Sequence, residues 1–242
     1  PMIEHRRILV LGATSAIAYA YAKIRARQEA KLFLVGRDPA KLLDNASVLS
    51  GSTPRIADLA DVRSIDRIVN EAIESLGAID EVFLAYGQYV AEPAADAEIE
   101  SVIQTNFTSA TVWLQHVSAH MAERNAGRIV VIGSVTGDRG RQKNYTYAAS
   151  KAGLERVAQG LRHRFSGTPV SVTFAKPGWV RTEMSEGRDT SSRLYVDPDR
   201  AAAAIASAAD RGRGVVYVPW YWRPISTAVR VLPNMLLRRL RV

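Results

Sequence analysis

Short apolar runs alternate along the chain with longer segments in which apolar residues recur at helical spacing. The runs have the length and the aliphatic content of buried strands. The predicted strands are Arg7–Leu11, Lys31–Val35, Pro54–Ala57, Glu81–Ala85, Arg128–Gly133, Val170–Ala175 and Gly214–Val218. The predicted helices between them cover residues 15–28, 39–48, 62–76, 97–123, 145–165 and 198–210.

This alternation is typical of an α/β protein in which helices cover both faces of a parallel sheet. Right-handed crossovers make such a sheet doubly wound, and a dinucleotide normally binds at the point where the strand order reverses. No repeat, low-complexity stretch or linker interrupts the 242 residues. The sequence therefore predicts a single domain over residues 1–242, with a doubly wound parallel sheet of about seven strands.

Several features narrow the classes of function. The chain has no cysteine, which excludes disulfide and thiolate chemistry. His116 and His120 have a spacing that can bind metal, but no glutamate lies between them, so a helix-surface pair is preferred and no metal is expected. No signal peptide precedes the first strand and no apolar run has bilayer length, so a cytoplasmic protein is expected.

The net charge of +8 is unevenly placed, because the tail at residues 223–242 contains five arginines and no acid. No reading helix or aromatic platform is recognisable, so no nucleic-acid partner is expected. Apolar residues recur at helical spacing in this tail: Ile225, Val229, Leu232, Leu236 and Leu240. The pattern suits peripheral contact with a membrane interface. Equally, it suits a helix buried against the core or a partner subunit, with its arginines in water.

The sequence also contains a candidate proton-transfer set. Tyr147 and Lys151 lie four residues apart in a predicted helix, so they share one face. The pKa of a phenol is about 10, and a nearby ammonium favours the phenolate and lowers that pKa. Ser134 follows a predicted strand and can hydrogen-bond the oxygen that Tyr147 protonates. The alternative is a helix-face tyrosine beside a solvated lysine.

The first predicted strand leads into a candidate phosphate-binding loop. Gly12 permits a tight turn beside a pyrophosphate, whose charge favours the N-terminus of the next helix. Thr14 and Ser15 add hydroxyl groups, and Ala16 and Ile17 open the helix. An ordinary strand-to-helix turn with a Ser/Thr cap is the alternative.

The second and third predicted strands end at a candidate adenosine site. Arg37 follows Gly36 where an acid would favour NAD, and a guanidinium suits a 2′-phosphate, so NADP(H) is favoured over NAD(H). Asp38 is an alternative cap for the next helix. Asp58 and Leu59 are placed to meet the adenine edge, although Asp58 or Asp61 can instead cap the next helix.

Taken together, these motifs resemble the short-chain dehydrogenase/reductase family over nearly the whole chain. The resemblance implies a Rossmann fold, an NAD(P)-dependent oxidoreductase acting on a CH–OH group, and roles for single residues. Tyr147 would be the general acid or base, Lys151 would lower its pKa and hold the nicotinamide ribose, and Ser134 would orient the carbonyl. Asn106 would hold a water that connects Lys151 to solvent; its alternative is a polar residue that bends a helix. The other residues matched to cofactor-binding positions are Gly12, Thr14, Ser15, Ala16, Ile17, Arg37, Asp58, Leu59, Ala85, Gly87, Pro177, Gly178, Val180 and Thr182.

The chain departs from the family pattern in places. Ala16 and Ala18 replace two loop glycines, and Leu11 replaces a threonine. An alanine adds only a methyl group, so binding is expected to be retained. Tyr86, in the segment after the fourth strand, is expected to pack on the cofactor or narrow the site.

The resemblance also bears on substrate and assembly. The family places a substrate lid where this chain has residues 183–197, in which Arg188 and Arg193 can meet an anionic substrate or remain solvated. The tail and the GATSAIA loop resemble the ketoreductases of the decaprenylphosphoryl-ribose epimerase system, which act on lipid-linked keto sugars. A small-molecule or lipid-linked carbonyl substrate is therefore expected, as is a location at the inner face of the membrane. The family implies a homodimer or homotetramer through helices 97–123 and 145–165.

Overall fold

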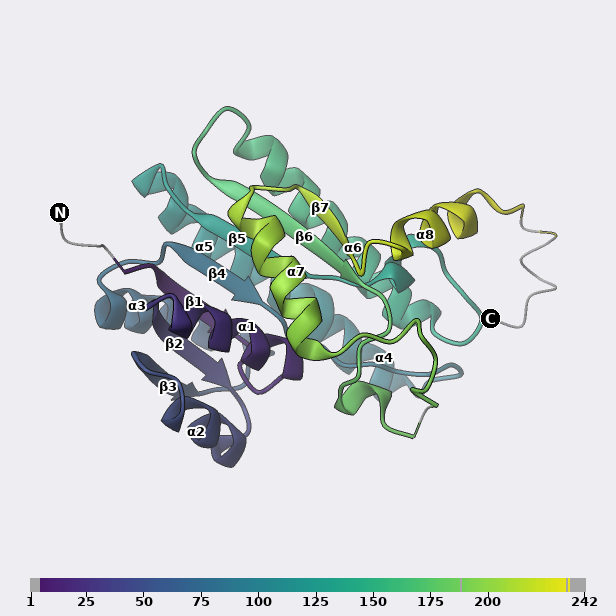
Figure 1. Ribbon diagram of the computed structural model, residues 1–242, viewed down its shortest axis with the longest axis horizontal. Helices are drawn as coiled ribbons and strands as arrows, with labels where there is room; N and C mark the ends of the chain where they lie inside the picture. Colours follow the sequence, from purple (N-terminus) through teal and green to yellow (C-terminus); the bar gives the residue numbers. More distant parts are fainter. Residues whose placement is uncertain (1–4, 188, 234, 236–242) are drawn as a thin grey trace.

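The computed structural model describes residues 5–187, 189–233 and 235. Through them runs a parallel sheet of seven strands in the order β3-β2-β1-β4-β5-β6-β7 (Figure 1). The strands are β1 (Arg7–Leu11), β2 (Lys31–Gly36), β3 (Ser52–Ile56), β4 (Glu81–Leu84), β5 (Arg128–Ile132), β6 (Ser171–Pro177) and β7 (Val215–Val218). The predicted doubly wound α/β fold is confirmed, and the strand bounds agree closely with those expected.

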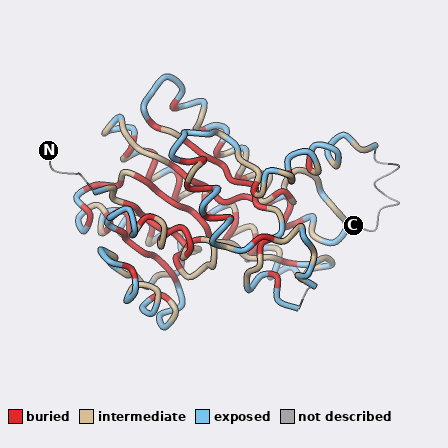
Figure 2. Tube along the Cα trace, viewed as in Figure 1, coloured by how far each residue is buried: buried red, intermediate tan, exposed pale blue. Residues whose placement is uncertain are grey.

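Helices cover both faces of the sheet. One face packs against α1 (Ala16–Arg27), α2 (Pro39–Ser47) and α7 (Pro198–Asp210). The other packs against α3 (Ile65–Leu76), α5 (Ala110–Arg124) and α6 (Tyr145–Arg164). Neighbouring residues of a strand point to opposite faces, so Ile8 contributes to the first core and Leu9 to the second. The central strands are buried along their length (Figure 2).

The predicted helix 97–123 is interrupted, which corrects the sequence expectation. It divides into α4 (Asp96–Ile103), a π-helical turn (Gln104–Ser109) and α5. Asn106, within the turn, has a side chain that accepts from the Gln88 backbone N–H at 2.7 Å and donates to the Gln88 carbonyl at 2.8 Å. The wider turn thus directs a polar residue at the loop after β4, as the helix-bending alternative anticipated.

The C-terminal tail forms a shorter helix than its apolar pattern suggests. Helix α8 (Trp222–Val231) ends before Leu232, whose backbone is extended. The reason is Pro233, because a residue that precedes proline avoids helical geometry. The predicted positions Leu236 and Leu240 lie outside the described residues. No helix in the described part of the chain has the length and apolar character needed to cross a membrane.

Helix α8 packs against the rest of the described structure at both ends. Its first residue, Trp222, is buried. At its other end the Arg139 guanidinium donates to the carbonyls of Val229, at 2.7 Å, and of Leu232. These carbonyls have no partner within the helix, so Arg139 serves as a C-terminal cap.

Candidate active site

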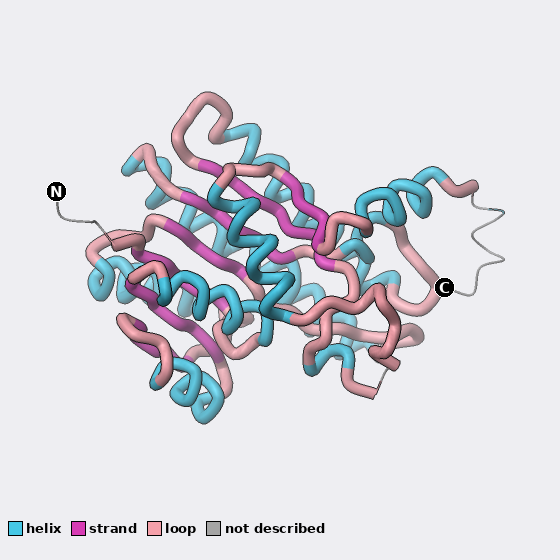
Figure 3. Tube along the Cα trace, viewed as in Figure 1, coloured by secondary structure: helices cyan, strands magenta, loops and turns pink. Residues whose placement is uncertain are grey.

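A cleft of about 390 Å³ lies at the carboxyl ends of the strands, beside the point where β1 and β4 are neighbours. The loops that follow the strands gather at this end of the sheet (Figure 3). Nearly all the predicted site residues line the cleft: Gly12, Thr14, Ser15, Ala16, Ile17, Arg37, Asp58, Leu59, Ala85, Gly87, Ser134, Tyr147, Lys151, Pro177, Gly178, Val180 and Thr182. Asn106 is the exception, since it is buried behind the cleft wall.

The loop after β1 brings the N-terminus of α1 to the cleft. Gly12 has a φ of +88°, and a Cβ there would lie 2.7 Å from Cβ of Tyr86. Only glycine therefore permits this close approach of two loops. The Ser15 hydroxyl accepts from the backbone N–H of Ala18 at 3.2 Å and caps α1, as its alternative role anticipated. The free N–H groups of the first turn and the helix dipole suit a phosphate.

The loop alanines and Tyr86 occupy different environments. Ala18 lies on the face of α1 that packs against the sheet and is fully buried, whereas Ala16 lies on the cleft wall. Tyr86, which was expected to pack on the cofactor or narrow the site, lines the cleft, and its hydroxyl lies 2.9 Å from Oγ of Ser109. Burial raises the pKa of Tyr86, and the negative charge of Asp58 raises that pKa further. Tyr86 thus forms a neutral part of the wall.

The candidate adenosine end contains one basic side chain after β2. Arg37 is exposed and lines the cleft. The Asp38 carboxylate instead accepts from the Lys41 backbone N–H at 3.1 Å and caps α2. Asp58 lines the cleft and accepts from the Ala60 backbone N–H at 3.0 Å. The cap of the next helix is Asp61, whose side chain accepts from the Arg63 backbone N–H.

Tyr147 and Lys151 project from the first turns of α6 into the same cleft, and both are buried. Lys151 Nζ lies 5.9 Å from the centroid of the Tyr147 ring. The Lys151 ammonium donates to the Ile132 carbonyl at 3.4 Å, a long hydrogen bond. Burial lowers the pKa of Lys151 to about 8. A weakly bonded ammonium beside a tyrosine is suited to bind hydroxyl groups and to favour a phenolate.

Ser134 is the N-cap of a 3₁₀ helix (Val135–Asp138) that follows β5. Its Oγ accepts from the Thr136 backbone N–H at 3.1 Å. A hydroxyl that accepts in this way keeps its own proton available for donation. Ser134 can therefore donate to a carbonyl oxygen in the cleft.

The family is decided by comparison of the sequence with known families. Residues 6–192 match the family model described as short chain dehydrogenase. The chain belongs to the short-chain dehydrogenase family. An uncharacterized oxidoreductase of Mycobacterium tuberculosis is 34% identical over 96% of each chain. Another, from Streptomyces coelicolor, is 33% identical over 98% of this chain and 96% of that one.

Solved structures share the fold of this short-chain dehydrogenase. Levodione reductase superimposes with a TM-score of 0.80 at 23% identity, covering 92% of this chain and 98% of that one. The actinorhodin polyketide ketoreductase, solved with NADPH, superimposes with a TM-score of 0.79 at 24% identity, covering 88% and 95%. At this identity the likeness establishes the fold.

In this short-chain dehydrogenase, Gly87 and Asn106 pack close to the Lys151 side chain. A Cβ on Gly87 would lie 2.9 Å from Asn106 Oδ1 and 3.1 Å from Lys151 Nζ. Asn106 Nδ2 also donates to Ser150 Oγ at 3.1 Å, which joins the π-helical turn to α6. Glycine is thus required where the loop after β4 passes between the side chains of Asn106 and Lys151.

Several cleft residues were not singled out from the sequence, although the last two lie in the predicted lid at residues 183–197: Tyr89, Thr136, Arg141, Asn144, Trp179, Met184 and Tyr195. The Tyr89 ring lies 5.2 Å from the Tyr147 ring. Trp179 contacts Trp222 of α8 at 5.4 Å between ring centroids. These residues lie in loops without a periodic pattern, so only the assembled sheet brings them to the cleft. Position 141 had one available signal, a basic residue shortly before Tyr147.

The histidine pair has other partners. His116 Nδ1 lies 3.3 Å from Asp66, and His120 Nε2 accepts from the Ile79 backbone N–H at 3.2 Å. Within the described residues, no three potential metal ligands are grouped.

Proposed function

We propose that this short-chain dehydrogenase interconverts a carbonyl compound and a secondary alcohol with NADP(H). The observation that carries the proposal is the convergence of Ser134, Tyr147 and Lys151 on the cleft that also receives the N-terminus of α1. The relatives named as oxidoreductases support the reaction class.

The proton chemistry follows from the three side chains. Tyr147 donates a proton to the carbonyl oxygen in reduction and accepts it in oxidation. Lys151 stabilises the phenolate, and Ser134 donates a hydrogen bond to the reacting oxygen. NADP(H) supplies or accepts the hydride. Asn106 is proposed to hold the water that links Lys151 to solvent.

The remaining cleft residues suit the parts of the cofactor. The loop from Gly12 to Ile17 is proposed to bind the pyrophosphate, with Thr14 and Ser15 as hydroxyl donors. Residues 177–182 would cradle the nicotinamide, with Val180 and Thr182 beside its carboxamide. Ala85 and Gly87 would face the ribose, while Asp58 and Leu59 would meet the adenine.

NADP(H) is favoured over NAD(H) because Arg37 is the charged residue that follows β2 in the cleft. A guanidinium binds a phosphate through paired, charge-assisted hydrogen bonds. Asp38 is occupied in capping α2, which removes the nearest acid from competition for the ribose hydroxyls. The NADPH named with the actinorhodin ketoreductase supports the same assignment.

A non-catalytic NAD(P) sensor with the same fold is the alternative, favoured by Ala16 and Ala18 in the glycine loop. Tyr147→Phe separates the two. An enzyme is expected to lose carbonyl reduction by at least about 100-fold, the range for a general acid, while cofactor binding is retained. Tyr145→Phe is the matched control, because Tyr145 lies on the same helix and is 53% exposed. A Tyr147→Phe variant with unchanged turnover would contradict the proposed mechanism.

A lipid-linked keto sugar, with residues 183–197 as a lid, is proposed as the substrate at the inner face of the membrane. The exposed side chains Trp220, Val231 and Met235, near Arg223 and Arg230, support peripheral membrane contact. We expect anionic vesicles to sediment the full chain and not a chain that ends at residue 222. Equal recovery of both forms in the supernatant would contradict this contact.

We also propose a homodimer or homotetramer formed through α4, α5 and α6. Light scattering tests this assembly directly, since a mass of 26.5 kDa would identify a monomer.

A further inference from the structure

Arg141 lies beside the proposed proton donor, in the loop that joins the 3₁₀ helix Val135–Asp138 to α6. The Asn144 backbone N–H donates to the Arg141 carbonyl at 3.2 Å and closes a turn immediately before the helix. Both side chains line the cleft, and Tyr147 follows on the first turn of α6. This turn therefore fixes Arg141 and Asn144 at the Tyr147 end of the cleft.

The Arg141 guanidinium has no ion pair or side-chain hydrogen bond among the described residues, although it is partly buried. Burial lowers the pKa of Arg141, and the charge of Asp138 opposes that effect. Asp138 is itself held by Lys176 and by the Tyr217 hydroxyl, which donates at 3.1 Å. A partly desolvated cation without a bound acceptor is unfavourable until an anion meets it.

The charged side chains that line the cleft give its Tyr147 end a net positive charge. Asp58 accepts from a backbone N–H at the adenosine end, and Glu183 is paired with Lys41. Beside Tyr147 the charged lining residues are Arg141 and Lys151.

We infer that the substrate carries an anionic group, a phosphate or a carboxylate, which Arg141 binds. This inference rests on the proposed function and names a substrate class for it: acidic carbonyl compounds. The planar guanidinium suits either oxyanion, because both offer two oxygens for paired hydrogen bonds. Arg141 acts here as a specificity residue.

The test compares matched ketones that differ in charge. Hydroxyacetone phosphate is paired with hydroxyacetone, and acetoacetate is paired with methyl acetoacetate. In Arg141→Gln, we expect the ratio of kcat/KM for the anionic over the neutral ketone to fall about 10- to 100-fold, the range for a hydrogen bond to a charged group. The pair that shows the larger fall identifies phosphate or carboxylate as the preferred anion.

Lys143→Gln is the control, because Lys143 is exposed in the same loop and its variant removes an equal charge. We expect its ratio to match the wild type. An unchanged ratio in Arg141→Gln, or an equal fall in Lys143→Gln, would overturn the inference.

A binding measurement separates failure of this inference from failure of the proposed function. Calorimetric titration of the NADP⁺-loaded protein with hydroxyacetone phosphate and with acetoacetate requires no turnover. If the wild type reduces no ketone but binds either anion at least tenfold more tightly than Arg141→Gln does, the anion site stands and the enzyme proposal fails. Equal binding by both proteins, or no binding by either, would overturn the anion site.

Discussion

At the scale of single residues, Lys151 has a buried charge that its chemistry requires. It is 4% exposed, and its one hydrogen bond to an acceptor in the described residues is the 3.4 Å contact with the Ile132 carbonyl. Burial lowers the pKa of Lys151 to about 8, so the group remains largely charged at neutral pH in the cofactor-free protein. The buried Lys151 ammonium lowers the free energy of unfolding of the protein, but it leaves a charged donor that can bind hydroxyl groups.

Lys151→Met is predicted to raise the free energy of unfolding of the cofactor-free protein while abolishing reduction. Because the pKa of Lys151 is lower in the folded state than in the unfolded chain, wild-type stability falls as the pH drops from about 10.5 to about 8. Below that pH the gain in the variant is on the order of 3 kcal/mol. Urea unfolding at pH 7 and pH 10 measures the difference; a gain that does not shrink at pH 10 would contradict the lowered pKa of Lys151 as its cause.

At the scale of secondary-structure elements, Lys176 joins three pieces of the site. It lies near the end of β6, is 1% exposed, and pairs with Asp138 and with Glu155, the latter at 2.8 Å. Asp138 ends the 3₁₀ helix that follows Ser134, and Glu155 lies one turn after Lys151 on α6. Burial acts to lower the pKa of Lys176, but the two carboxylates outweigh it, so the pKa is raised.

Lys176→Met is predicted to destabilise the protein by about 3–5 kcal/mol at pH 7, because two buried carboxylates lose their cation. The deficit should shrink at pH 5. Uncompensated burial raises the pKa of a carboxyl group, so the variant gains protons on folding as the pH falls. Urea unfolding at both pH values measures the deficit. A deficit below about 1 kcal/mol at pH 7 would contradict a stabilising role for the ion pairs of Lys176 with Asp138 and Glu155.

The sequence predicted elements better than their interruptions. The strands followed from apolar runs and agree closely with the structure, because buried parallel strands have a strong local signal. The π-helical turn around Asn106 has no such signal, since it depends on Gln88 and Ser150, which come from other segments. The proposed set of Ser134, Tyr147 and Lys151 was predictable because its spacing along the chain is a local signal. Arg141 has no such spacing signal, and only the folded structure shows that it lines the cleft.

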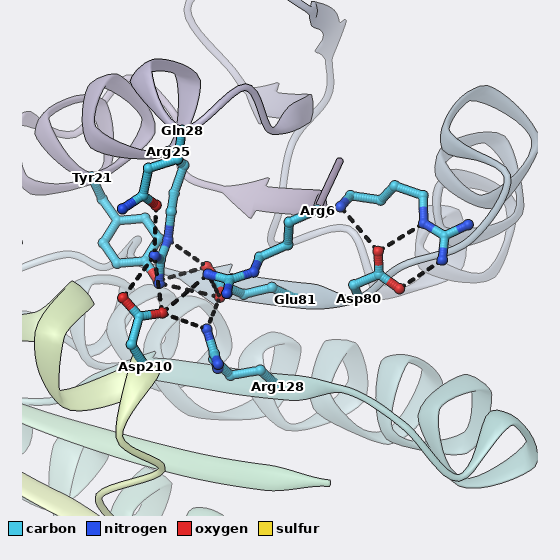
Figure 4. A network of polar contacts seen from close by, with 9 residues as sticks. Arg6, Tyr21, Arg25, Gln28, Asp80, Glu81, Arg128 and Asp210 are labelled. Carbon is cyan, nitrogen blue, oxygen red and sulfur yellow. Dashed lines mark hydrogen bonds and ion pairs between the residues drawn. The ribbon is translucent and has the colours of Figure 1, made fainter. Parts of the chain in front are cut away.

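At the scale of the whole molecule, a buried charge network lies at the amino ends of the strands, opposite the cleft (Figure 4). Glu81, the first residue of β4, is fully buried. It accepts from the Tyr21 hydroxyl at 2.6 Å and from Arg25 at 3.1 Å, both on α1, and from Arg128 at 2.9 Å. Asp210, at the end of α7, pairs with Arg25 and Arg128. The network thus connects the sheet with two helices of one face.

Glu81→Gln is predicted to lower the free energy of unfolding by about 3–5 kcal/mol, since it leaves buried guanidinium groups facing a neutral side chain. Asp199→Asn is the control, because Asp199 is 72% exposed and pairs with Lys23 at 2.7 Å. An exposed pair of this kind contributes about 0–1 kcal/mol. Equal losses in the two variants would contradict a special role for the buried network.

Titration of the purified protein with NADPH and with NADH, followed by cofactor fluorescence, tests the proposed NADP(H) dependence. We expect both cofactors to bind, with at least about tenfold tighter binding of NADPH, and a comparable loss of that preference in Arg37→Asp. Tighter binding of NADH would overturn the role of Arg37 and leave the proton chemistry standing. Binding of neither cofactor would contradict the proposed NADP(H)-dependent oxidoreductase.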